Sequence, residues 1–443
     1  MATGTASTPG RRTARRAAGA ALVGTLIEWY DFALYGAAAA LIFKDQFFGA
    51  DDQLTGLLAA FATFAVGYFA RPIGGIVFGH LGDRIGRKPV MITTLLIMGI
   101  CTALIGALPT YATAGVLAPV LLVALRVIQG LGAGAEYAGA ITLSAEASTP
   151  GRRGFYSSWS GVGLWLGSAL GLLTFNALDA LTGDGFLVWG WRIPFLASVI
   201  VLAISLYVRL RVTETKQPGD QAAGEAAHKI PLVTLLVTEK RRLLVALGSN
   251  FLLSGFTYIP QVWALSYLTN NLGMAAGIGL AINAAIFLVG SPFLPYFGKL
   301  GDRIGRRKLL MFAACFGIVW TVPMFLLIDT RNPWLVAAGL IICWVGVAST
   351  GVAAQGAFLT ELFPAATRYS GIAFAREITG AILGGLAPLI ATALYAGAGH
   401  WWPIAIFMGA NALITLIAAH QSKHFRSDAD QDREIMEPAA IAA

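Results

Sequence analysis

The sequence contains little charge for its size. Only 12% of its 443 residues are Asp, Glu, Lys or Arg, whereas 57% are hydrophobic, and the mean hydropathy is +0.70. A soluble domain carries about 25% charged residues, so this chain has too few charged side chains to cover an ordinary water-facing surface. The composition excludes a soluble globular protein and indicates a chain that crosses a membrane many times.

Cysteine and histidine are also scarce. The three cysteines, Cys101, Cys315 and Cys343, lie in apolar runs without metal-ligand spacing, which is typical of small core side chains. The five histidines lie near the ends of these runs or in loops: His80, His228, His400, His420 and His424. We recognise no nucleophile–base pair, metal cluster or nucleotide-binding glycine loop. We therefore expect neither an enzyme nor a bound metal or cofactor.

Apolar runs of about 20 residues, the length that crosses roughly 30 Å of hydrocarbon, follow one another along the chain. Because a bilayer offers no water to backbone groups, each run is expected to be a helix. We predict an all-α polytopic membrane protein. Its twelve spans are expected at residues 20–43, 54–79, 89–108, 113–140, 155–178, 190–210, 243–269, 275–297, 309–328, 334–360, 370–396 and 402–420.

Lys and Arg are unevenly distributed between the loops. Placing both termini in the cytoplasm assigns most of the 31 Lys and Arg to cytoplasmic segments, as the positive-inside rule requires. The basic start is not a signal peptide, because Glu28 and Asp31 interrupt the apolar run that follows it. The net charge of +8 therefore reports topology and contact with anionic lipid. Nucleic acid is not an expected partner, since no basic segment is interleaved with stacking aromatics.

A short polar sequence occurs twice in this apolar chain. GHLGDRIGRKP at 79–89 and GKLGDRIGRRK at 298–308 place Asp83 and Asp302 219 positions apart. Duplicated halves of this kind form transporters whose site lies between the halves near the membrane midplane. We predict a cytoplasmic tail, a six-helix half, a cytoplasmic linker, a second six-helix half and a second cytoplasmic tail, at residues 1–19, 20–211, 212–242, 243–420 and 421–443.

The repeated loops are candidate gates. Their Asp residues are suited to cap a helix start, or to pair with basic groups of the opposite half when the inner side is closed. A second pair of matching positions, 215 residues apart, joins Glu146 and Arg153 to Glu361 and Arg368. A positive-inside turn without a gating role is the alternative. The predicted gating residues are Asp83, Arg84, Arg87, Asp302, Arg303, Arg306, Glu146, Arg153, Glu361, Arg368, Arg376 and Glu377.

The repeated loop resembles the signature loop of the major facilitator superfamily, and RVIQGLGAGAEYAGA at 126–140 resembles its fourth-helix motif. GTLIEWYDFALYG at 24–36, together with FARPIGGIVFGHLGDRIGRK and ELFPAATRYSGIAF, resembles the metabolite:proton symporter family. This resemblance implies twelve helices in two pseudo-symmetric halves and proton-coupled uptake of a small solute by alternating access. Carriers in that family take α-ketoglutarate, citrate, shikimate, proline or betaine. Ala135 and Tyr137 replace the Gly and Trp common in relatives, a change that we expect to alter the pocket beside Glu136.

Apart from Arg192 and Arg209 at the two ends of the sixth span, seven Asp, Glu and Arg residues lie within the predicted spans. A charged residue at a helix centre costs about 2.5–3.5 kcal/mol, so these side chains are expected to face the bundle interior and to pair or hydrate. We predict that protons are handled by four of them: Asp31, Glu28, Arg126 and Glu136. The alternative for Arg126 is pairing with Glu28 or Asp31 that only holds the first half together. For Arg376 and Glu377, near an inner span end, packing at the inner gate is the favoured interpretation.

Arginine at this depth also predicts the charge of the solute. A guanidinium holds a carboxylate through two hydrogen bonds, which favours a mono-, di- or tricarboxylate and makes Arg71 the better candidate for solute contact. The second half offers uncharged groups instead, because Asn250 stands opposite Asp31 and Gly290 opposite Arg71. The predicted substrate-binding residues are Arg71, Arg126, Asn250, Tyr258 and Gln261. Uptake of a zwitterionic osmolyte, proton-driven export and a non-transporting sensor are the alternatives, and we expect a functional monomer.

Overall fold

The computed structural model describes residues 11–49, 52–85, 87–134, 153–211, 237–364 and 367–425. Within these ranges every regular element is a helix. We call residues 11–211 the amino half and residues 237–425 the carboxyl half. The breaks between α3 and α4 and between α15 and α16 lie at the end of the bundle that also holds Arg11 and Phe425, here called the loop end. The opposite end is called the far end.

The amino half crosses the bundle six times. The crossing segments are formed by α1 (Arg11–Leu41), α3 (Gln53–Ile85), α4 (Arg87–Ala107), α6 (Leu117–Ala133), α8 (Arg153–Thr182) and the pair η1 (Phe186–Gly190) and α9 (Arg192–Arg211). Two short helices turn the chain at the far end, α2 (Phe43–Gln46) and α5 (Tyr111–Ala114). Asp52 caps the start of α3, since the backbone N–H and the hydroxyl of Thr55 both donate to it at 3.0 Å. These bonds hold the pKa of the exposed Asp52 carboxyl below its usual value.

The carboxyl half also crosses six times, and π-helical turns interrupt three of its crossings. The seventh crossing is formed by α12 (Lys240–Phe251), η2 (Leu252–Phe256), η3 (Ile259–Trp263), α13 (Ala264–Ser266) and η4 (Tyr267–Asn271). The next three are formed by α14 (Ala276–Gly290) with α15 (Phe293–Ile304), α16 (Arg306–Asp329), and α17 (Pro333–Cys343) with η5 (Trp344–Ser349) and α18 (Thr350–Leu362). The last two are formed by α19 (Arg368–Thr379) with η6 (Gly380–Gly384) and α20 (Ala387–Ala398), and by α21 (Trp402–Gln421) with η7 (Ser422–His424).

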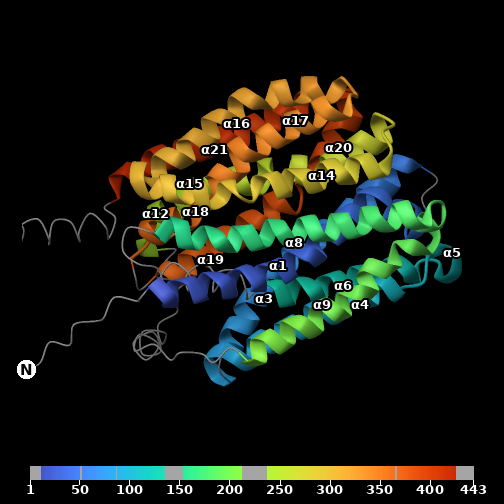
Figure 1. Cartoon of the computed structure of the whole chain (residues 1–443), viewed down its shortest axis with the longest axis horizontal. Helices are drawn as coiled ribbons and strands as arrows, with labels where there is room; N and C mark the ends of the chain where they lie inside the picture. Colours follow the sequence, from blue (N-terminus) through green and yellow to red (C-terminus); the bar gives the residue numbers. More distant parts are fainter. Residues whose placement is uncertain are drawn as a thin grey trace, which may run out of the picture.

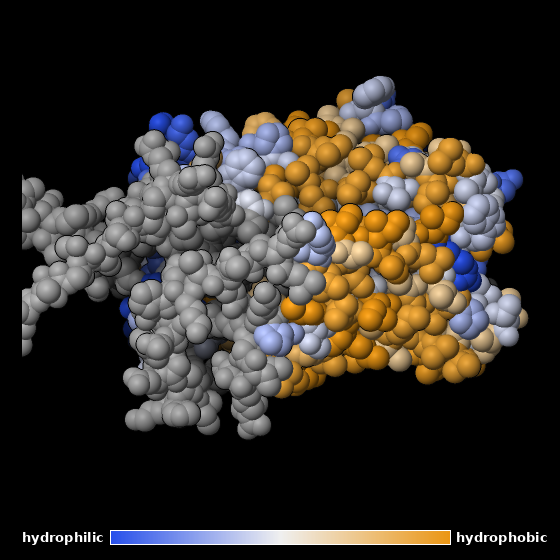
Figure 2. Space-filling view, turned by 60° about the horizontal axis from the view of Figure 1, so that its bottom comes forward, coloured by the Kyte–Doolittle hydropathy of each residue, from blue (hydrophilic) through white to orange (hydrophobic). Residues whose placement is uncertain are grey.

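The predicted number of spans is confirmed. Of the helices in the described ranges, nine are long and apolar enough to cross a membrane, and Leu117–Ala133 and Arg192–Tyr207 are shorter apolar helices. With α1 they make up the twelve predicted spans. Figure 2 shows the surface expected of such a bundle: apolar residues cover the visible flank, and hydrophilic residues gather at the far end.

Several helices extend past the predicted span edges. α1 begins at Arg11 although the apolar run begins near residue 20, and α3 continues to Ile85. Hydropathy marks the part of a helix that lies in lipid, whereas backbone hydrogen bonds continue into the polar ends. The fourth span was predicted to reach residue 140, but α6 ends at Ala133 and residues 135–152 lie outside the described ranges.

Helix α8 lies between the two groups of helices (Figure 1) and packs against α1 on one side and α14, α15 and α18 on the other. Its glycines permit this close approach to α1. A Cβ atom on Gly163 would lie 2.1 Å from the carbonyl oxygen of Leu22, and one on Gly167 would lie 2.0 Å from that of Leu26. The four-residue glycine spacing is thus a packing feature of the α1–α8 contact.

Candidate solute and proton site

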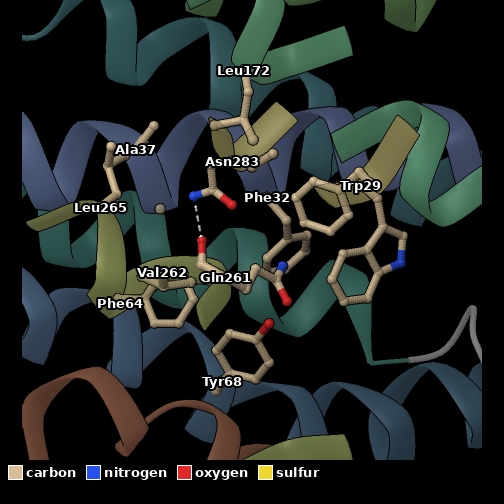
Figure 3. Close-up of a pocket in the computed structure, with 13 residues that line it drawn as sticks. Trp29, Phe32, Ala37, Phe64, Tyr68, Leu172, Gln261, Val262, Leu265 and Asn283 are labelled. Carbon is tan, nitrogen blue, oxygen red and sulfur yellow. Dashed lines mark hydrogen bonds between the residues drawn. The ribbon is translucent and has the colours of Figure 1, made fainter. Parts of the chain in front are cut away.

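A narrow cavity lies where the two halves meet, with room for about one water molecule. The amino half contributes residues of α1, α3 and α8, and the carboxyl half contributes residues of η3, α13 and α14. Figure 3 shows most of these side chains around the cavity. The lining comprises Trp29, Phe32, Ala33, Gly36, Ala37, Phe64, Tyr68, Leu172, Gln261, Val262, Leu265, Asn283 and Phe287.

The cavity wall is largely apolar, with five aromatic residues and a few polar groups. The predicted Gln261 lines it, and its backbone carbonyl accepts a hydrogen bond from Asn283 Nδ2 at 2.7 Å. In the view of Figure 3 the Gln261 amide lies between the rings of Phe32 and Tyr68. A small pocket with apolar walls and a few oriented polar groups is the usual form of a small-molecule site.

A chain of hydrogen bonds links Arg126 to Asp31 in the amino half. Arg126 Nη1 donates to Gln129 Oε1 at 2.6 Å, Gln129 Nε2 donates to Thr102 Oγ1 at 2.8 Å, and Thr102 Oγ1 donates to Asp31 Oδ2 at 2.9 Å. We call these four residues the relay. All four are buried, and Arg126 has no exposed surface. Arg126 and Asp31 are therefore linked through two uncharged side chains and not by the direct pairing given as the alternative for Arg126, because α4 lies beside α6 and supplies Thr102.

Both buried guanidinium groups of the amino half lie over aromatic rings. The Arg71 Cζ is 4.0 Å from the centre of the Phe32 ring and 4.5 Å from that of Tyr68, while Arg126 Cζ is 3.9 Å from Tyr35 and 5.0 Å from Phe32. Phe32 and Tyr68 also line the cavity, so these rings connect it to the two cations. A cation over an aromatic ring gains about 2 kcal/mol when desolvated.

Glycine contacts between α3 and α6 fix these positions. A Cβ on Gly67 would lie 2.4 Å from Arg126 Nε, and a Cβ on Gly134 would lie 1.9 Å from the carbonyl oxygen of Arg71. Within the described residues, Arg126 Nε and Nη2 have no hydrogen-bond acceptor. The site therefore holds buried donors that an acceptor group could satisfy.

Of the predicted proton-handling residues, the structure describes only the backbone of Glu28 and no part of Glu136. Glu28 lies on α1 one turn before Asp31, which places both on the same side of the helix; only the backbone of Glu28 is described. Glu136 lies outside the described ranges.

The carboxyl half contains a second polar chain, built from uncharged groups and one arginine. Arg376 Nη1 donates to Gln355 Oε1 at 3.3 Å, and Gln355 Nε2 donates to Asn250 Oδ1. Asn250 Nδ2 in turn donates to the carbonyl oxygen of Ala246 at 2.7 Å. Asn250 is thus bonded within its own half and does not line the cavity. Arg376 is thus linked through the buried side chain of Gln355 to Asn250 on the seventh crossing.

The predicted Tyr258 joins the two halves directly. Its hydroxyl lies 2.6 Å from the hydroxyl of Tyr68, and both rings are buried. By contrast, Trp263 and Tyr267, two further aromatic residues of the seventh crossing, stack on each other with ring centres 4.8 Å apart. The Tyr267 hydroxyl donates to Asp329 at 3.1 Å, away from the residues that line the cavity.

At the loop end, the repeated Asp302 bonds to the opposite half. The backbone N–H groups of Gly154 and Phe155, at the start of α8, donate to its two carboxylate oxygens at 2.9 and 3.0 Å. A carboxylate at a helix start is stabilised both by these bonds and by the helix dipole. The prediction of basic partners across the halves is therefore modified: in the described residues, Asp302 meets backbone N–H groups of α8 and a basic side chain of its own half.

The other predicted gating residues are distributed as follows. Arg306 bonds to Asp302 at 2.9 Å and to Glu361, which ties α16 to α15 and α18. Arg303 is exposed, and Arg368 and Glu377 are half-buried on α19. For four further residues only the backbone is described, at the ends of α3, α4 and α8: Asp83, Arg84, Arg87 and Arg153. Glu146 lies outside the described ranges.

At the far end, a contact that the sequence did not indicate also joins the halves. Lys44 Nζ donates to Asn270 Oδ1 at 2.7 Å, and Asn176 Nδ2 donates to the carbonyl oxygen of Gly277 at 3.1 Å. Lys44 is buried, although its place after an apolar run suggested an ordinary outer span end. The two halves are thus joined at both ends of the bundle, with the narrow cavity between these contacts.

Comparison with known proteins agrees with this architecture. Residues 21–388 match the Major Facilitator Superfamily. The shikimate transporter of Escherichia coli K12 is 38% identical over 415 residues, which cover 92% of this chain and 94% of that protein. The proline/betaine transporter of the same organism is 34% identical over 415 residues, covering 91% and 82%.

Solved structures show the same fold. The proton:xylose symporter bound to 6-bromo-6-deoxy-D-glucose superposes with a TM-score of 0.71 at 16% identity, covering 92% of this chain and 94% of that one. The partially occluded inward-open form of the xylose transporter from E. coli gives a TM-score of 0.69 at 16% identity, covering 92% and 96%. With twelve crossings, a site between two halves and this similarity over most of its length, the chain belongs to the Major Facilitator Superfamily, a family of membrane transporters.

Proposed function

We propose that this protein is a proton-coupled symporter that imports a small organic anion, such as a mono-, di- or tricarboxylate, by alternating access. The observation that carries the proposal is the relay, in which Arg126 reaches Asp31 through Gln129 and Thr102. Intramembrane acids in such networks are the usual carriers of protons in transporters. Trp29 and Phe32 line the cavity from α1, the helix that also carries Asp31.

Protonation of Asp31 changes the charge at one end of the relay. As a carboxylate, Asp31 accepts from Thr102 and offsets the charge of Arg126 through the two linking side chains. As a neutral acid it no longer offsets that charge, so the guanidinium gains affinity for another anion. Proton and solute then bind together, which is the requirement for symport.

The two cations on Phe32 favour an anionic solute. Arg71 and Arg126 lie 4.0 and 5.0 Å from the centre of the same ring. Like charges this close repel one another in a medium of low dielectric constant, and a carboxylate between or beside them relieves that repulsion. The similarity to a shikimate transporter supports this choice, because shikimate carries a carboxylate.

Charge balance sets the coupling. A proton entering down roughly 150 mV releases about 3.5 kcal/mol, enough for accumulation of several hundred-fold at about 1.4 kcal/mol per tenfold. One proton carried with a monoanion is electroneutral and draws only on the pH difference. Uptake driven by the membrane potential therefore needs at least one proton more than the charge of the anion.

The contacts at the two ends support alternating access. The bonds from Gly154 and Phe155 to Asp302 close the loop end, and the bond from Lys44 to Asn270 closes the far end. We infer that each is broken in turn as the halves rock. We further infer cytoplasmic termini at the loop end, an inner-membrane location with lipid contact, function as a monomer, and no cofactor besides the proton gradient.

A zwitterionic osmolyte is the second candidate. The proline/betaine transporter is 34% identical, and aromatic walls such as Trp29 and Phe32 are suited to a quaternary ammonium group. Against it, Arg71 already lies over Phe32 and Tyr68, two of the rings such a cation would use.

Uptake by the purified chain in liposomes tests the proposal. An acidic outside buffer is imposed, and radiolabelled shikimate, succinate, citrate, proline and glycine betaine are offered separately. We expect at least one carboxylate to be accumulated above equilibrium, with the accumulation lost when an uncoupler collapses the gradient. Accumulation of proline or betaine alone would favour the osmolyte reading. Accumulation of a carboxylate that survives the uncoupler would refute proton coupling.

A further inference from the structure

A hydroxyl pair lies at the junction of the two halves. Tyr68, on α3, and Tyr258, between η2 and η3, are 1% and 7% exposed, and their hydroxyl oxygens are 2.6 Å apart. Tyr68 also lines the cavity, and Figure 3 shows its hydroxyl directed toward Gln261. The pair is therefore both a bond between the halves and part of the cavity wall.

Glycines of the eleventh crossing cover this pair closely. A Cβ on Gly384 would lie 3.2 Å from the Tyr258 ring, and one on Gly385 would lie 2.9 Å from Tyr68 Cβ. The backbone around η6 thus packs directly on both tyrosines. A change in the distance between the hydroxyl groups would move η6 with them, because close-packed interiors transmit such displacements.

Each half supplies a cation to the region of the pair. The Arg71 guanidinium is 4.5 Å from the centre of the Tyr68 ring. Arg376, from the carboxyl half, bonds to Gln355, which donates to Asn250 on the crossing that carries Tyr258. An anion at the hydroxyl pair would therefore be attracted from two sides.

The chemistry of the pair suits a carboxylate. Two phenol hydroxyls carry two protons, and one proton occupies the bond between them. A carboxylate has two acceptor oxygens, so it can accept from both hydroxyls at once. Hydrogen bonds to an ionised acceptor are roughly twice as strong as bonds between neutral groups.

We propose that the hydroxyl pair of Tyr68 and Tyr258 is a carboxylate subsite: the solute carboxylate inserts between the two hydroxyls and replaces their mutual bond, with Arg71 and Arg376 supplying the opposing charge. This inference rests on the proposed function, since it takes the solute to be a carboxylate. It adds Tyr68 to the residues that bind the solute, and it moves Arg376 from the inner gate to the solute. In this arrangement the bound solute replaces the bond between Tyr68 and Tyr258 as the link between the two halves.

Conservative substitutions test the subsite. Tyr68→Phe and Tyr258→Phe remove only the hydroxyls and keep the rings on which Arg71 and η6 pack. We expect each to weaken binding of radiolabelled shikimate to the purified protein by about tenfold or more. The double variant should weaken it by less than the product of the two, since both hydroxyls serve one carboxylate. Arg376→Gln should weaken binding similarly, and Arg376→Lys should weaken it less.

Tyr267→Phe is the matched control, because Tyr267 is buried and its hydroxyl donates to Asp329 away from the cavity. Its affinity for shikimate should equal that of the wild type. If the wild type accumulates shikimate and both Phe variants bind it as tightly, the subsite is refuted and the proposed function stands. If the wild type accumulates none of the carboxylates under an acid gradient, the proposed function and this inference both fail.

Discussion

The two halves of the bundle share a framework but differ in chemistry. In the amino half the relay has opposite formal charges at its ends and comprises Asp31, Thr102, Gln129 and Arg126. The positions 219 residues later hold uncharged side chains: Asn250, Thr321, Ala348 and Val345. The threonine persists, and both Thr102 and Thr321 lie within bonding distance of a carbonyl oxygen one turn earlier in their own helix, at 2.9 and 2.6 Å, but Thr102 also lies 2.9 Å from Asp31 Oδ2. The comparison teaches that the repeated scaffold places helices alike while only the amino half carries the relay charges, and we propose on this basis that the amino half handles the proton.

The helices also differ in regularity. Among the described elements, five of the six π-helical segments belong to the carboxyl half, and three of these lie in the seventh crossing. π-Helical turns are frequent at functional sites and shift the side chains that follow them. Gln261 lies in one such segment and lines the cavity. We infer that the regular amino half holds the charges in place, whereas the carboxyl half adjusts its shape to the solute.

The largest effect is expected when Asp31, the buried acid of the amino half, is replaced by the uncharged residue found at the matching position of the carboxyl half. Asp31→Asn gives the amino half the residue that the carboxyl half has at position 250. Accumulation of carboxylate under an imposed pH gradient should be abolished, while exchange of labelled for unlabelled solute continues, because the site remains but the proton carrier is gone. Asp184→Asn, at an exposed position of the far end, is the control. Continued uphill uptake by Asp31→Asn would show that another group carries the proton.

The next largest effect should follow substitution of Arg71, because the matching position of the carboxyl half carries no charge. Arg71 corresponds to Gly290. Arg71→Gln should weaken apparent affinity for the carboxylate by roughly 30-fold or more, the cost of losing one partner of a buried charge pair. Arg71→Lys should also weaken it severely, because an ammonium lacks the planar fork. The exposed Arg303→Gln should leave affinity unchanged. Unimpaired carboxylate uptake by Arg71→Gln would return Arg71 to a packing role and favour the osmolyte reading.

A smaller effect should come from cutting the relay at its middle. Thr102→Val removes the hydroxyl that receives from Gln129 and donates to Asp31. Loss of a hydrogen bond to a charged group corresponds to about tenfold, which we expect as the fall in steady-state accumulation. Thr321→Val is the matched control, since it removes the corresponding hydroxyl from the carboxyl half. Equal losses in the two variants would mean that the relay is only packing.

The smallest of these effects should concern the loop end, where the halves touch. Asp302→Asn weakens the cap on the start of α8 and should lower the maximal rate about fivefold, the scale of a helix cap. Affinity for solute should hardly change, because Asp302 is remote from the cavity residues. We expect a similar fall in the maximal rate for Asp83→Asn, because Asp83 holds the matching position in the first copy of the repeated loop. A large loss of affinity at an unchanged maximal rate would instead indicate a role in the solute site.

Sequence patterns predicted the spans and three of the charged side chains that lie buried within them. Apolar runs identify spans because lipid demands them, and Asp31, Arg71 and Arg126 stand out because charge is rare there. The linking groups were not predictable in the same way. Thr102, Gln129 and Gln355 are uncharged, and whether such side chains meet depends on how each helix is rotated against its neighbours. Arg376 was expected to pack at the inner gate from its distance to a span end, and that distance did not identify Gln355 as its partner.

Proton movement driven by solute tests the central claim most directly. Liposomes containing the protein and a trapped pH-sensitive dye are given a carboxylate substrate without an imposed gradient, and the internal pH is followed. We predict that solute acidifies the interior for the wild type and for Asn250→Ala, whose transport rate should fall less than about threefold, but not for Asp31→Asn. Acidification by Asp31→Asn, or its loss in Asn250→Ala to the same extent, would contradict the assignment of proton coupling to the amino half.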